Sequence, residues 1–112
     1  MNLLKEITTQ LKMEVRPNSI EGEYLEAVIQ KSDLNFLDAL LTKHLGKPVK
    51  EPGKEADVPA DIQGLIDSMG GLRIGQSFFY KKGEGKQVIY AALWPWESNP
   101  EKITLKAGVH SL

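Results

Sequence analysis

Apolar residues recur at helical spacing in three segments of the first 71 residues. The segments are residues 2–13, 33–45 and 59–69. Intervals of three and four residues place the apolar side chains of each segment on one face of an α-helix. These faces consist of Leu3, Leu4, Ile7 and Leu11; of Leu34, Leu37, Leu40, Leu41 and Leu45; and of Ile62, Leu65, Ile66 and Met69. The sequence therefore predicts three helices, each packing by one apolar face.

The segment 33–45 carries signals at both of its ends. Ser32 or Asp33 precedes it and is suited to cap the first turn of a helix. Gly46 follows it and is typical of the left-handed residue that ends a helix. His44 lies in the last turn, where a basic side chain offsets the negative end of the helix dipole. These signals predict a helix that begins near residue 33 and ends at residue 45.

The period of the pattern changes to two residues near residue 72. Residues 72–82, 86–96 and 102–109 alternate apolar and polar side chains, and short connections join them. Three such segments in succession predict an antiparallel meander with one face to bury.

Residues 23–30 fit two patterns. As a strand, this segment places Leu25, Ala27 and Ile29 on one face. As a helix, it would start at a capping box formed by Asn18 and Glu21. We favour the strand, because Gly22 is unfavourable inside a helix.

Together these segments predict a single α+β domain over residues 1–112, with the element order α-β-α-α-β-β-β. An antiparallel meander sheet of three or four strands packs on about three helices, which lie mainly on one side of it. The connection at residues 46–58 is long for a loop and carries many charges, so we expect it to be mobile.

The hairpin between residues 72–82 and 86–96 admits two registers. We favour a loop at Gly83–Gly85, because it separates apolar from polar side chains better and lets Gly85 adopt a left-handed conformation. It pairs Phe78 with Tyr90 and gives one face the side chains of Leu72, Ile74, Phe78, Tyr80, Val88, Tyr90, Trp94 and Trp96. A two-residue loop at residues 84–85 would shift every pair by one residue and bring Arg73 opposite Trp96.

Both tryptophans of the chain lie in the short stretch "YAALWPWESNP" at residues 90–100. In the favoured register Trp94 belongs to the core, beneath the helix 33–45. Pro95 cannot donate to a strand ladder, so the strand ends there or lies at a sheet edge. Trp96 is then expected at the rim of the sheet. The candidate residues for binding a ligand or a partner are Arg73, Tyr90, Trp94, Trp96 and Glu97.

Composition excludes several classes of function. The chain has no cysteine, so it forms no disulfide and no cysteine-based zinc site. No apolar run is long enough for a membrane helix, and the N-terminal segment is too polar for a signal peptide. These features predict a cytoplasmic protein. Residues 1–71 hold 8 basic and 12 acidic residues against 6 and 3 in residues 72–112, and only two basic residues are arginines, which argues against sequence-specific nucleic-acid binding.

No arrangement of residues predicts catalysis. The two histidines lack the spacing of metal ligands, and "GGLRIG" follows a helix rather than a strand, unlike a dinucleotide-binding loop. We therefore predict no cofactor and no metal, and favour a non-enzymatic module that binds a protein partner or itself through an open last strand. The alternative is a site for a small anionic ligand at the aromatic end of the sheet, with Arg73 as its anchor.

Overall fold

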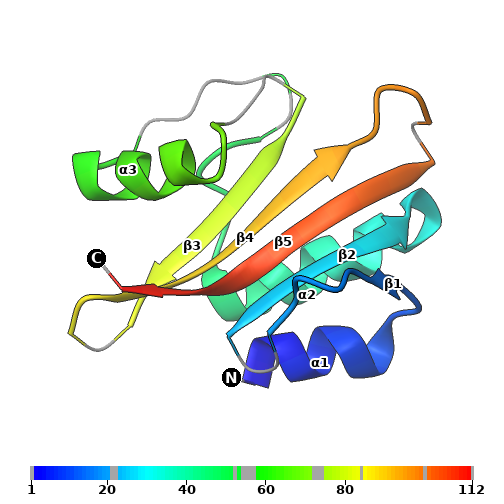
Figure 1. Cartoon of the computed structure of the whole chain (residues 1–112), viewed down its shortest axis with the longest axis horizontal. Helices are drawn as coiled ribbons and strands as arrows, with labels where there is room; N and C mark the ends of the chain where they lie inside the picture. The colour runs from blue at the N-terminus through cyan, green and yellow to red at the C-terminus, as the bar shows by residue number, and fades with distance from the viewer. Residues whose placement is uncertain are drawn as a thin grey trace.

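The computed structural model of the chain describes residues 2–20, 23–51, 53, 58–71, 75–83, 85–99 and 101–111. These residues form an α+β domain in the predicted element order (Figure 1). The helices are α1 (Asn2–Gln10), α2 (Leu34–Leu45) and α3 (Ala60–Ser68), with a 3₁₀ turn at Lys31–Asp33. The strands are β1 (Glu14–Val15), β2 (Tyr24–Gln30), β3 (Ser77–Lys82), β4 (Gln87–Pro95) and β5 (Lys102–Ser111). No helix among the described residues is long and apolar enough to cross a membrane.

The described strands form one antiparallel sheet in the order β1-β2-β5-β4-β3. The meander β3-β4-β5 and the strand β2 were both predicted and are confirmed. The predicted count of three or four strands is wrong, since β1 makes a fifth. That strand has two exposed residues and pairs at one edge of the sheet, so it leaves no alternating pattern in the sequence.

The last strand, β5, lies in the middle of the sheet. It pairs with β2 along Tyr24–Gln30 and with β4 along Gln87–Pro95. Its backbone groups are therefore engaged on both sides, and the prediction of an open last strand is wrong. The error arose because a meander read from sequence order alone leaves its final strand at an edge.

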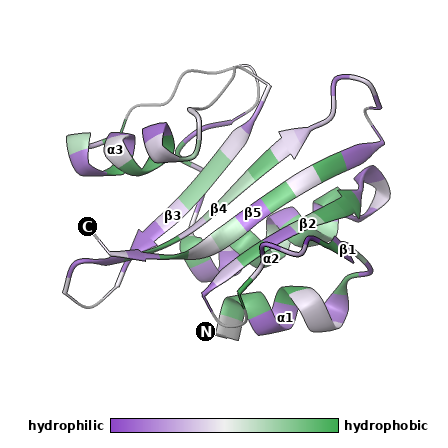
Figure 2. Ribbon diagram, in the orientation of Figure 1, coloured by the Kyte–Doolittle hydropathy of each residue, from purple (hydrophilic) through white to green (hydrophobic). Residues whose placement is uncertain are grey.

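Helices cover both faces of the sheet. Helices α1 and α2 pack on one face, against residues that include Ile29, Phe79 and Leu105, whereas α3 packs on the other, against Phe78, Val88 and Tyr90. Figure 2 shows hydrophobic residues along β4 and on the side of α3 that faces the sheet. Two of the three described helices thus share one face, as expected of helices that lie mainly on one side. The expectation that the tryptophan face lies beneath α2 is wrong, since Trp94 packs in the cluster beneath α3.

The hairpin between β3 and β4 takes neither predicted register. Phe78 lies opposite Ala92 rather than Tyr90, and Lys82 lies opposite Val88. The N–H of Gly83 donates to the carbonyl of Gln87 at 2.9 Å, and Gly85 adopts a φ of 63°, the left-handed conformation expected of it. Because the shift from the favoured register is two residues, the described side chains of β3 and β4 keep their predicted faces. Leu72 and Ile74 lie outside the described residues.

The ends of α2 follow the sequence signals in part. Gly46 adopts a φ of 82°, and its N–H donates to the carbonyl of Thr42 at 2.9 Å, as a helix stop requires. Asp33 precedes the helix but forms no side-chain capping bond. His44 does more than offset the dipole, because its Nε2 lies 2.6 Å from a carboxylate oxygen of Glu6 and joins α2 to α1.

Candidate functional site

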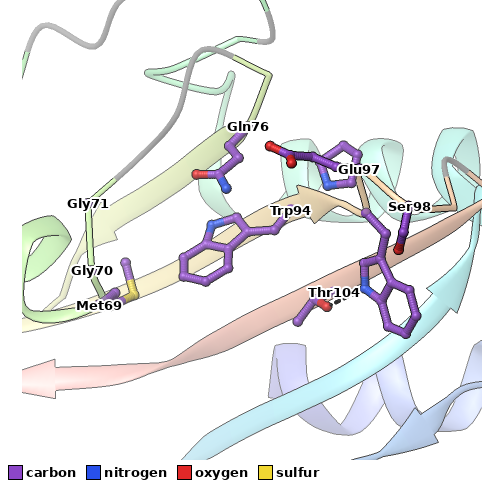
Figure 3. Close-up of a pocket in the computed structure, with 10 residues that line it drawn as sticks. Met69, Gly70, Gly71, Gln76, Trp94, Glu97, Ser98 and Thr104 are labelled. Atoms are coloured by element: carbon purple, nitrogen blue, oxygen red, sulfur yellow. Dashed lines mark hydrogen bonds between the residues drawn. The ribbon is translucent and has the colours of Figure 1, made fainter.

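A hollow of about 550 Å³ lies at the end of β4, between that strand and the residues that follow α3. Figure 3 shows the side chains around it. Its walls come from three parts of the chain. The lining residues are Met69, Gly70, Gly71, Gln76, Trp94, Pro95, Trp96, Glu97, Ser98 and Thr104. A volume of this size falls within the range of small-molecule sites in proteins.

Trp96 is held in place by the neighbouring strand β5. Its indole Nε1 donates to Oγ1 of Thr104 at 2.8 Å, and its backbone N–H donates to the carbonyl of Lys102 at 3.0 Å. The ammonium of Lys102 lies 5.3 Å from the centre of the indole ring. Pro95 ends β4, as predicted, so Trp96 lies just beyond the strand with its ring partly buried.

Trp94 makes the closer cation–π contact of the two tryptophans. The ammonium of Lys106 lies over its indole at 3.7 Å from the ring centre, a close cation–π contact. The indole packs partly buried against the cluster beneath α3. Its Nε1 is buried and has no hydrogen-bond partner among the residues that the structure describes. Figure 3 shows this nitrogen edge turned toward Gln76.

Lys106 is itself anchored by a polar network on the neighbouring strand β2. Its ammonium lies 3.9 Å from Oε1 of Glu26, and the same oxygen accepts hydrogen bonds from the Tyr24 hydroxyl at 2.7 Å and from Nδ2 of Asn18 at 3.2 Å. Burial of this carboxylate favours its neutral form. The hydrogen bonds and the charges of Lys106 and Arg16 outweigh that effect and hold the pKa of Glu26 below its usual value.

A buried lysine anchors the opposite wall of the hollow. Lys50 is only 3% exposed, and its ammonium donates to the carbonyls of Gln76 at 2.8 Å and Glu51 at 2.9 Å. Its backbone pairs with Phe78 beside β3. Lys50 therefore ties the connection before α3 to Gln76. Burial lowers the pKa of Lys50. The predicted mobility of residues 46–58 stays a prediction, and residues 52 and 54–57 lie outside the described residues.

The structure brings three of the five predicted site residues together. Trp94, Trp96 and Glu97 line the hollow. Tyr90 is absent from the lining and lies in the core at 6% exposure, where its ring stacks on Phe78 with 6.3 Å between ring centres. Arg73 lies outside the described residues.

Sequence reasoning missed the other lining residues. Thr104 is directly opposite Trp94 in the ladder of β4 and β5, so a correct register of this pair would have found it. Met69, Gly70 and Gly71 follow α3, and no pattern in the sequence indicates which face of the sheet that helix covers. Gln76 depends on the same placement.

Comparison with known proteins provides no assignment. The chain matches no protein-family model, no curated protein and no solved structure. The site must therefore be interpreted from its own chemistry.

The described lining residues are suited to noncovalent binding. They offer two indoles, a thioether, an amide, two hydroxyls and one carboxylate, which is that of Glu97. Within the described parts of the chain, no three His, Cys, Asp or Glu side chains are grouped as they would be to hold a metal ion. The described walls combine flat apolar surface with hydrogen-bonding groups that carry little charge.

Two tyrosines with raised pKa values, Tyr24 and Tyr90, are expected to make the protein less stable at high pH. Burial raises the pKa of Tyr90, and burial followed by the hydrogen bond to Glu26 raises the pKa of Tyr24. An unfolded tyrosine ionises near pH 10, so above that pH the unfolded state loses protons that the folded state retains. The free energy of unfolding therefore falls as pH rises above 10, and below pH 10 the full contribution of both tyrosines is present.

The contribution of the buried Tyr90 to this decline grows with pH and approaches at most about 1.4 kcal/mol per pH unit, the value for one whole proton, above pH 10. Urea unfolding of the protein and of Tyr90→Phe, over roughly pH 9 to 11, measures it. The lowered pKa of Lys50 makes the free energy of unfolding rise with pH below the ordinary pKa of lysine. This contribution is the same in both proteins, so the difference between their slopes isolates Tyr90. Equal slopes in the two proteins would contradict the prediction.

Proposed function

We propose that the protein binds a small molecule in the hollow at the end of β4. The ligand places a planar apolar group against the indoles of Trp94 and Trp96 and presents a hydrogen-bond acceptor to Trp94. The volume of the hollow, about 550 Å³, supports this proposal, as does the mixture of aromatic surface and a few polar groups around it.

The observation that carries the proposal is the unpaired N–H of Trp94. A buried donor without a partner costs about 1–3 kcal/mol, so native structures rarely keep one without a reason. The indole of Trp96, in the same wall, has its N–H paired with Thr104. The nitrogen edge of Trp94 is turned toward the side chain of Gln76, another lining residue, so an acceptor reaches it when Gln76 moves aside and the indole stays beneath Lys106. A bound ligand then recovers the cost of the missing hydrogen bond.

Self-association, the first function that the sequence favoured, has less support. Its basis was an open last strand, and β5 is paired on both sides. At the outer edge of β3, Phe78 is already paired with Lys50, and the charged residues Lys81 and Lys82 follow. Short, charged edges discourage strand addition by a second chain.

A binding screen tests the proposal. Calorimetry and tryptophan fluorescence are measured against a library of small planar molecules, each carrying a carboxylate, an amide or an amine. We expect at least one class to bind and to shift the tryptophan emission. In Trp94→Phe, which keeps an aromatic ring but lacks the donor, the affinity of that class falls about tenfold, the effect of one lost hydrogen bond.

Trp96→Phe is the matched control, because the N–H that it removes is already bonded to Thr104. It loses ring area but no unpaired donor, so its affinity falls less than that of Trp94→Phe. A library in which nothing binds refutes the proposal. Equal losses in the two variants refute the role of the Trp94 N–H, provided that circular dichroism shows both variants folded.

A further inference from the structure

We infer that the ligand of the hollow is an anion, most simply a carboxylate on a planar ring, and that Lys106 sets this preference through the indole of Trp94. The inference rests on the proposed function, since it names the charge of the molecule that this same site binds. Two lysines, Lys106 and Lys102, lie over the indoles of Trp94 and Trp96.

The lysines first argue against a cationic ligand. The attraction between a cation and an aromatic ring comes from the electron density on the ring face. Lys106 already occupies one face of Trp94, at 3.7 Å from the ring centre. A second cation on the opposite face would lie closer to Lys106 than the roughly 10 Å over which salt screens charges, so the two would repel each other. Lys102, at 5.3 Å from the centre of the Trp96 ring, acts in the same sense.

The same contact favours an anionic acceptor at the nitrogen of Trp94. A positive charge over the ring draws electron density from the indole, which makes its N–H a stronger donor. Hydrogen bonds to an ionised acceptor are roughly twice as strong as those between neutral groups. The unpaired N–H of Trp94 therefore gains most from a carboxylate.

The nearby carboxylates leave this preference in place. Glu26 lies 3.9 Å from Lys106 and accepts hydrogen bonds from Tyr24 and Asn18, so it fixes the ammonium over the indole. Glu97 lines the hollow but is exposed, so water and salt screen its charge. Lys106 is largely shielded, with its side chain only 19% exposed, and its charge acts at short range.

Three molecules of nearly the same shape test the inference: benzoate, benzamide and benzamidinium, which are anionic, neutral and cationic. We expect calorimetry at pH 7 to show benzoate binding at least tenfold more tightly than benzamide, and benzamidinium binding most weakly. In Lys106→Met, which keeps the apolar stem but not the charge, benzoate loses its advantage, whereas the affinity for benzamide changes less than twofold. In Lys106→Arg, which keeps a cation over the ring, the advantage returns.

Lys81→Met is the matched control, since it removes an exposed lysine of β3 that does not line the hollow. It should retain the preference for benzoate. Binding of benzamide as tight as that of benzoate, or a preference that survives in Lys106→Met, overturns the inference and leaves the proposed function standing. If none of the three molecules binds at millimolar concentration, the inference is refuted, and the library screen decides separately whether the proposed function is refuted too.

Discussion

Replacing either Phe78 or Phe79 with alanine is expected to lower the free energy of unfolding by about 3–5 kcal/mol. The two side chains are neighbours in β3 and point to opposite faces of the sheet, and both are fully buried. Phe78 packs in the cluster beneath α3, and Phe79 packs in the cluster formed by α1 and α2. Each truncation therefore leaves a cavity in a different part of the core.

Denaturant unfolding of the two variants measures these losses. Phe36→Ala is the control, because it makes the same chemical change on α2 at a side chain that is 49% exposed. Its loss is expected to be well under half of that of either core variant. A sheet with only one covered face would give one large loss and one close to the Phe36→Ala value, and that result would contradict the two-sided arrangement.

The same pair shows how far the sequence determines the fold. Alternation assigns Phe78 and Phe79 to opposite faces, and this assignment is right even though the predicted pairing of Phe78 with Tyr90 is off by two residues. An alternating pattern shows on which face of the sheet each side chain lies, but it does not show which residue lies opposite on the neighbouring strand. The reason is that a shift of two residues returns every side chain to the same face. The sequence thus predicted the faces correctly and the ladder incorrectly.

The placement of α3 was beyond the sequence for a related reason. The apolar stripe of Ile62, Leu65 and Ile66 predicts that the helix is buried against something. It does not say which face of the sheet that is, since both faces of β3 and β4 carry apolar residues. The long connection from α2 leads to the opposite face, and part of it pairs with Phe78 through Lys50.

The candidate site likewise contains residues that the sequence pattern groups together and residues that only strand pairing brings together. Trp94, Trp96 and Glu97 are close in sequence, so their common position at the end of one strand followed from the pattern. Thr104, Lys106 and Gln76 come from other segments and needed the tertiary pairing. The ammonium above the Trp94 ring is a contact between two strands, and the unpaired N–H of Trp94 depends on the side chains packed around it. Neither feature leaves a trace in a single sequence.

Gly108 is the described glycine at which an added Cβ would meet the closest neighbouring atom. It lies in the central strand β5, opposite Tyr24 on one side and Tyr90 on the other. A Cβ at this position would lie 2.6 Å from the carbonyl oxygen of Glu23 and 3.2 Å from the hydroxyl of Tyr90. The Glu23 carbonyl is fixed, because it accepts a hydrogen bond from the N–H of Val109 at 3.0 Å.

Gly108→Ala is therefore expected to destabilise the protein by about 1–3 kcal/mol, the usual cost of forcing backbone to move in a packed sheet. Gly64→Ala is its counterpart. Gly64 lies exposed in α3 with nothing near a new Cβ, and alanine there should stabilise the protein by about 0.5–1 kcal/mol. Denaturant unfolding compares the two. The signs differ because Gly108 has no room for a Cβ, whereas alanine at the exposed Gly64 has the higher helix propensity. A neutral Gly108→Ala would mean that β2 and β5 separate more easily than their close contact at Glu23 implies.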